Sequence, residues 1–137
     1  AGPSLSGGLL VTTAPPPTLP SIAKAACAPG NGTLCLRENR FRVEVTWNDH
    51  LSQRTGIGHA LPLTDESGYF WFFEPGNLEL VVKILDGRGL NNHFWVFYGA
   101  LSDVEYTITV TDTTNGKRRR YRNASGNFCG RGDVDAF

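Results

Sequence analysis

Residues 41–47 read Phe41-Arg42-Val43-Glu44-Val45-Thr46-Trp47, and this stretch decides the fold class. Its apolar side chains recur at every second position, with charged or hydroxyl side chains between them. A period of two indicates a β-strand with one buried face and one solvent face, whereas an amphipathic helix has a period near 3.6 residues. The segment therefore predicts an antiparallel sheet that packs on one side against a core.

Strand-like stretches recur along the chain at intervals of roughly 8–12 residues, and polar turns rich in glycine and proline separate them. A weaker strand near residues 60–64 precedes strong ones at residues 69–73, 78–85, 94–98 and 106–111. Residues 86–92 read as a loop, and no stretch shows a helical period. This pattern is typical of an all-β sandwich or barrel.

Two local patterns refine the prediction. Tyr106 begins an alternating run, at the place where immunoglobulin-like sandwiches carry a tyrosine that bonds back across a corner. The dipeptide Asn115-Gly116 predicts a type I′ hairpin turn, followed by a return strand over residues 117–122. We therefore predict an all-β, antiparallel immunoglobulin-like β-sandwich with an extended N-terminal arm.

The arm is residues 1–26, where glycine and proline are frequent, and the sandwich domain is residues 27–137. Proline-rich chain is stiff, extended and unable to continue a helix. Within the arm, Leu9, Leu10 and Val11 form a short apolar run with strand character. Three interpretations stay open: an edge strand on its own domain, a strand donated to a neighbouring subunit, or a mobile linker.

Composition excludes several classes of protein. The chain has 137 residues, 13 basic and 13 acidic side chains, and 40% hydrophobic residues. Such a chain is too apolar to be disordered and carries no net charge that would attract nucleic acid. No apolar run reaches the roughly 18 residues of a membrane helix. The absence of methionine leads us to expect a processed or excised piece, such as a mature secreted protein.

The three cysteines predict a small disulfide-closed loop. Residues 29–32 form a turn that brings Cys27 and Cys35 together, and this leaves Cys129 over. Three pairings are open, and we favour Cys27–Cys35 with Cys129 free or intermolecular. A zinc site is disfavoured because the spacing is not CxxC and no histidine is close in sequence.

The aromatic strands provide the candidate interaction site. Residues 69–73 and 94–98 lack the polar alternation of a half-exposed strand. Either loops or the arm cover their second face, or that face is exposed and binds a protein subunit or sugar rings. The candidate interaction residues are Tyr69, Trp71, Trp95 and Tyr98 on the strands and Leu9, Leu10 and Val11 on the arm.

No pattern points to catalysis or to a resident metal. The nucleophile motif GxSxG is absent, and the histidines at 50, 59 and 93 are scattered. Calcium held by loop oxygens is the remaining cofactor alternative, with the candidate ligands Asp65, Glu66, Asp86 and Asp103. We therefore predict no catalytic residues, no metal ligands and no cofactor.

A basic run occupies the return strand at residues 117–122. Positive charge on an edge hairpin discourages aggregation from edge to edge. In a protein with no net charge, it can also meet an acidic patch on a partner. Nucleic-acid binding is disfavoured.

The chain from Cys27 onward resembles an uncharacterised bacterial secreted β-sandwich module, often found at the ends of surface or secreted multidomain proteins. The residues that carry the resemblance lie at 34–36, 40–47, 65–73, 80–87, 93–101 and 133–137. The resemblance implies extracellular or cell-surface localisation and brings no catalytic residues. We predict a non-catalytic extracellular interaction module that assembles with other subunits, itself included, by strand addition through its arm. The alternative is a carbohydrate-binding accessory module that uses exposed Trp and Tyr rings.

Overall fold

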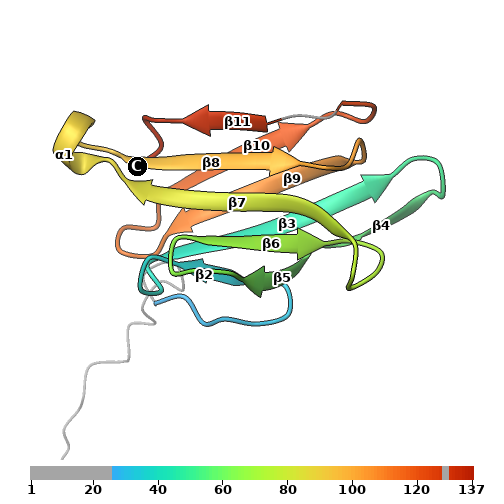
Figure 1. Cartoon of the computed structure of the whole chain (residues 1–137), viewed down its shortest axis with the longest axis horizontal. Helices are drawn as coiled ribbons and strands as arrows, with labels where there is room; N and C mark the ends of the chain where they lie inside the picture. Colours follow the sequence, from blue (N-terminus) through green and yellow to red (C-terminus); the bar gives the residue numbers. More distant parts are fainter. Residues whose placement is uncertain (1–25, 128–129) are drawn as a thin grey trace, which may run out of the picture.

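The structure is a computed structural model that describes residues 26–127 and 130–137, and these residues form two packed antiparallel sheets (Figure 1). The first sheet has the order β10-β9-β3-β2, and β4 pairs with the second half of β3, after the part that pairs with β2. Its strands are β2 (Leu34–Leu36), β3 (Phe41–Asp49), β4 (Arg54–Ile57), β9 (Glu105–Asp112) and β10 (Arg118–Asn123). The second sheet has the order β11-β8-β7-β6-β5. Its strands are β5 (His59–Pro62), β6 (Ser67–Trp71), β7 (Leu78–Asp86), β8 (Phe94–Ala100) and β11 (Gly130–Asp133).

The predicted alternation in β3 is confirmed. Phe41, Val43, Val45 and Trp47 are all buried, and the residues between them are half-buried or exposed. The inward side chains of β7, β8 and β9 complete one core. Rings cross the interface between the sheets, as where the centroids of Phe41 and Phe94 lie 4.9 Å apart. The prediction of an all-β sandwich is therefore confirmed.

Two local predictions differ from the structure. The loop predicted at residues 86–92 contains one helical turn, α1 (Arg88–Asn91), which ends where Asn92 adopts the left-handed conformation at φ 69°. At the β9–β10 turn, only Gly116 has positive φ, so the turn is not type I′. The reason is Asp112, whose backbone carbonyl accepts the N–H groups of both Asn115 and Gly116. The return strand is confirmed as β10.

The predicted disulfide between Cys27 and Cys35 is present, with an S–S distance of 1.96 Å. It ties the segment before β2 to β2 itself, and the N–H of Cys27 donates to the carbonyl of Asn39. Cys129 lies outside the described residues, as do Leu9, Leu10 and Val11 of the arm.

Candidate functional site

The outer side of the second sheet is apolar over most of its length. Inward side chains of β6, β7 and β8 are buried, and most of the alternate ones point outward and are half-buried, except that Lys83 is exposed and Glu79 is buried. The register places Leu61, Tyr69 and Val81 in one row across β5, β6 and β7. Figure 1 shows this sheet from its outer side with no described element in front of it. We call this surface the aromatic face, and its residues are Leu61, Tyr69, Trp71, Val81, Leu85, Trp95 and Phe97.

Three of the predicted interaction residues, Tyr69, Trp71 and Trp95, lie on the aromatic face. The prediction for Tyr98 is wrong, because this residue is only 6% exposed and points into the core. Its ring packs against Tyr106 and Tyr121 of the opposite sheet, at centroid distances of 6.3 and 5.5 Å. Successive side chains of a strand point to opposite faces. Tyr98 is therefore inward because Phe97 is outward.

One end of the aromatic face is built around Trp71. The rings of Trp71 and His59 are stacked at 3.8 Å with an interplanar angle of 19°. The Nδ1 atom of His59 lies 3.0 Å from the side-chain oxygen of Asn31. Sequence reasoning missed His59 and Leu61, although it predicted a weak strand near residues 60–64, where the structure has β5.

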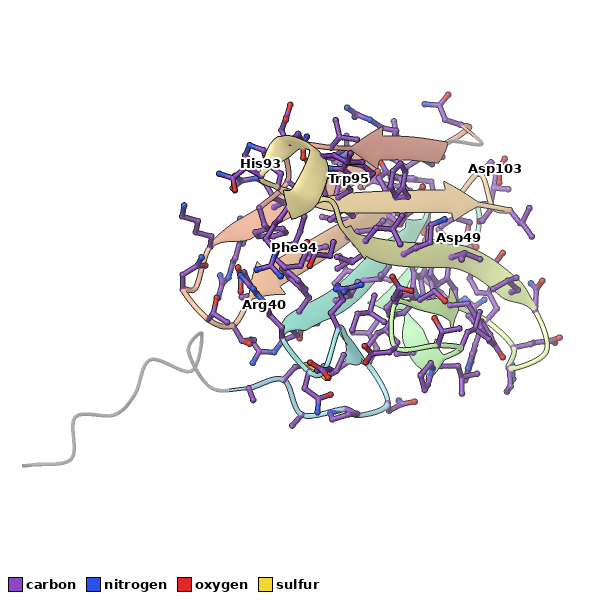
Figure 2. The ribbon with its side chains drawn as sticks, turned by 60° about the vertical axis from the view of Figure 1, so that its left-hand side comes forward. Arg40, Asp49, His93, Phe94, Trp95 and Asp103 are labelled. Carbon is purple, nitrogen blue, oxygen red and sulfur yellow. A yellow bond between two sulfur atoms is a disulfide. The ribbon has the colours of Figure 1, made fainter. Side chains whose placement is uncertain are left out.

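The other end is built around Trp95, which Figure 2 shows beside the α1 turn. Its indole N–H donates to the side-chain oxygen of Asn91 in α1 at 2.8 Å. Gly87 lies directly against the ring, because a Cβ atom there would stand 2.0 Å from Cε2 of the indole. Next to Trp95, the ammonium of Lys83 lies 5.5 Å from the centroid of Phe97. One edge and one side of Trp95 are thus occupied by the chain itself.

The two tryptophans are far apart along the sheet. Trp71 pairs with Leu78 and Trp95 pairs with Leu85, so their partners are seven positions apart along β7. At a rise of about 3.3 Å per residue, this separation is roughly 23 Å. No single sugar ring spans both, and the aromatic face is an elongated surface rather than a pocket.

A second feature is a hollow of about 310 Å³ at the end of the sandwich near α1. The guanidinium carbons of Arg40 and Arg88 each lie 4.4 Å from the ring centroid of Phe94, and that of Arg37 lies 5.9 Å from it. Figure 2 shows Arg40 and Phe94 together at this end. The lining residues are Arg37, Glu38, Arg40, Asp65, Arg88 and Phe94.

The charges of this hollow are compensated within the chain. Arg88 forms a bidentate pair with Asp86, and this bonding is the main reason that the pKa of Asp86 lies well below its usual range. Arg37 pairs with Glu66 at 2.8 Å, and Arg40 pairs with Asp112. A site for an anionic ligand needs cations that are not already paired. The arginines that line the hollow therefore form ion pairs and ring contacts that hold the two sheets together; we call this group of residues the clamp.

The four candidate calcium ligands are not brought together. Asp65 accepts the backbone N–H of Glu38, while Glu66 and Asp86 are paired with arginines. Asp103 lies at the opposite end of the sandwich from Phe94, as Figure 2 shows. Among residues 26–127 and 130–137, no group of three or more His, Cys, Asp or Glu side chains is placed to hold a metal ion.

Glu79 is a buried carboxyl group that sequence reasoning missed, since it stands in an otherwise apolar strand. Burial raises its pKa, and the negative charge of Asp103 raises it further. Its backbone carbonyl accepts the N–H of Leu101 at 2.8 Å.

In the described part of the chain, no helix has the length and apolar character to cross a membrane. Comparison of the chain with protein-family models, with curated proteins and with solved structures found no significant match.

Proposed function

We propose that this chain is a non-catalytic, secreted β-sandwich module that binds protein through the aromatic face in an extracellular or cell-surface assembly. The observation that carries the proposal is an outer sheet face of aromatic and aliphatic side chains interrupted by the charge of Lys83. Contiguous apolar surface of this kind marks interaction sites on soluble proteins. The Cys27–Cys35 disulfide supports an oxidising compartment.

Protein is a better partner than sugar for this face. Sugar sites combine a free ring face with polar groups that bond the hydroxyls. Here His59 covers one side of Trp71, and Asn91 takes the indole N–H of Trp95. Between the two tryptophans, the outward side chains of β7 are the aliphatic Val81 and a single cation, Lys83, whose ammonium already lies over the ring of Phe97. Protein interface cores are rich in aromatic residues and poor in charge, as this face is.

The apolar run of the arm is the occupant we propose. Residues 12–25 separate Val11 from the first described residue, Ala26, and 14 extended residues reach about 48 Å. That reach exceeds the separation of the two tryptophans, so Leu9, Leu10 and Val11 can cover the aromatic face of the same chain or of a second copy. If the arm of one copy binds to the next copy, and its main chain pairs with a sheet edge there, the copies join into an assembly or a filament.

The test is deletion of residues 1–20, with molar mass measured by light scattering and assembly followed by electron microscopy. We expect the full chain to associate and the deleted chain to stay monomeric. Trp71→Ala is expected to weaken association in the same way, whereas Leu51→Ala, at a leucine that is 98% exposed in a loop off the face, is the matched control. Unchanged mass after the deletion would reject assembly through the arm.

A glycan array distinguishes the alternative function, carbohydrate binding, from the proposed protein binding. A carbohydrate-binding module predicts retention of specific glycans by the full chain and loss of retention in Trp71→Ala and Trp95→Ala. Circular dichroism shows whether each variant is still folded. Glycan binding that survives the deletion of residues 1–20 would favour the carbohydrate function over the one proposed.

We also infer that the sandwich is of the immunoglobulin-like type. The chain passes from one sheet to the other between β8 and β9 and again between β10 and β11, as Greek-key sandwiches do. Tyr106 lies buried near the start of β9, the position of the corner tyrosine in that fold. An experimental structure superposed on immunoglobulin-like domains tests this inference.

A further inference from the structure

The first sheet ends in an open, strongly basic strand. Among the described strands, β10 pairs with β9 alone and lies at the end of its sheet (Figure 1). The backbone groups on its far side are therefore unpaired by any described strand, although the carbonyl of Arg118 accepts a hydrogen bond from Nη1 of Arg119 at 3.1 Å. Such an edge accepts an additional strand through main-chain hydrogen bonds unless its side chains prevent it.

The arginines of β10 are arranged in register. Arg118, Arg120 and Arg122 stand opposite Thr111, Thr109 and Thr107 of β9. The intervening Tyr121 points inward and is buried, so the three arginines share the outer face. Their spacing along the strand is about 6.7 Å, twice the rise per residue. Arg42 of β3 extends the charge, because it flanks Thr111 on the side away from Arg118.

Most of this charge is uncompensated. Arg122 shares Glu105 with His50, at 3.2 Å from the carboxylate oxygen. For Arg118 and Arg120, no carboxylate of the described residues lies within ion-pair distance, in contrast to the arginines of the clamp near α1. The acid in register with Arg120 is Glu44, which lies two strands away, or about 10 Å across the sheet.

We propose that β10 binds an extended polypeptide segment of a partner protein that carries acidic residues at alternate positions. The segment pairs with β10 as an added strand and sets its carboxylates opposite Arg118 and Arg120. Two features match at once. Arg118, Arg120 and Arg122 on the outer face have the spacing of alternate residues in a strand, and the planar guanidinium binds a carboxylate through two parallel hydrogen bonds.

A polypeptide fits this surface better than another polyanion. A nucleic acid or a sulfated glycan would satisfy the arginines but would leave the open backbone groups of β10 unpaired. The arm is excluded as the ligand, because residues 1–23 contain no acidic side chain. The aromatic face belongs to the other sheet, so this proposal stands independently of the proposed function.

The test is titration of the full chain with an eight-residue peptide in which glutamate and valine alternate. A second peptide of the same composition, with its four glutamates contiguous, is the control for charge, and a heparin octasaccharide is the polyanion probe. Binding is followed up to 1 mM by fluorescence anisotropy and by backbone amide NMR. The variants are Arg118→Glu with Arg120→Glu, and Arg131→Glu, which changes the charge of an exposed residue in the other sheet.

We expect the alternating peptide to bind, with slowed amide exchange in β10. We expect roughly tenfold weaker binding for the contiguous peptide and for the variant with both charges reversed, because opposed cross-strand charges stabilise pairing and like charges weaken it. Arg131→Glu should bind as the native chain does. Equal binding of the two peptides, stronger binding of heparin, or no binding of the alternating peptide would each overturn the proposal. In the last case, the arginines serve only to keep the edge from aggregating.

Discussion

The substitution Asp112→Asn tests whether one buried carboxylate holds the end of the sandwich together. Asp112 is 1% exposed and stands at the end of β9. Its two oxygens accept Nε and Nη2 of Arg40 at 3.1 and 2.9 Å, and the backbone N–H and hydroxyl of Thr114 at 3.0 and 2.7 Å. The guanidinium of Arg40 in turn lies on Phe94 of the other sheet. The carboxylate therefore links the β9–β10 turn, the start of β3 and the second sheet.

The expected loss is about 2–3 kcal/mol in the free energy of unfolding. A hydrogen bond to a charged group contributes about 1.5–3 kcal/mol. An asparagine side chain keeps one oxygen acceptor, but its NH₂ group would face a donor of Arg40 or Thr114 where the carboxylate has its second oxygen. The side chain of Arg40 keeps 30% of its exposure, so water compensates part of its lost partner. The loss is thus smaller than the roughly 3–5 kcal/mol typical of a fully buried pair that is broken.

The loss of unfolding free energy in Asp112→Asn is expected to become smaller at acid pH. Burial by itself raises the pKa of Asp112, but the hydrogen bonds from Arg40 and Thr114 together outweigh it and leave the pKa below 3.8. A carboxyl whose folded pKa is lowered stabilises the fold above its unfolded pKa of about 4, and this contribution is lost as the pH falls through the folded value. Asparagine does not titrate. The difference between the native chain and the variant should therefore be constant above pH 5 and should narrow below pH 4.

The assay is urea unfolding followed by tryptophan fluorescence at pH 7, 5, 4 and 3, with the disulfide intact. Asp135→Asn, at an exposed position near the second sheet, is the matched control and should change stability by less than about 0.5 kcal/mol. A loss in Asp112→Asn as small as that of the control, or a difference that widens toward acid pH, would refute the reasoning.

Three further outcomes are expected. Replacement of Cys27 and Cys35 by serine should cost about 2.5 kcal/mol of unfolding free energy in urea titrations, the chain-entropy value for a loop with a sequence separation of 8. Gly87→Ala should displace the ring of Trp95, shift its fluorescence and cost about 1–3 kcal/mol, because the new methyl group would overlap the indole. Glu79→Gln should raise the urea midpoint at pH 7 but not at pH 3, since burial followed by the charge of Asp103 raises the pKa of this acid and disfavours its ionised form.

The sequence predicts the sandwich well because its strands alternate or are bounded by clear turns. Residues 41–47 and 106–111 have the correct face buried, and the short loop between Cys27 and Cys35 closes as expected. The turn at Asn115-Gly116 could not be predicted from the dipeptide alone. Its conformation follows from Asp112, whose backbone carbonyl accepts the N–H groups of Asn115 and Gly116 and whose carboxylate accepts the N–H and hydroxyl of Thr114. The preference of the dipeptide for type I′ is therefore overridden by the hydrogen bonds that Asp112 accepts within the turn.

The sequence identifies the strands that form the aromatic face, but it does not show which side chains of those strands point outward and which point into the core. In residues 94–98 every side chain is aromatic or β-branched, so composition cannot say which ones point outward. The register supplies the answer through Lys83, whose ammonium must remain in water. Lys83 pairs with Phe97, and directly opposed residues of neighbouring strands share a face. Phe97 and Trp95 are therefore outward and Tyr98 inward, so a single lysine in the adjacent strand fixes the exposed set.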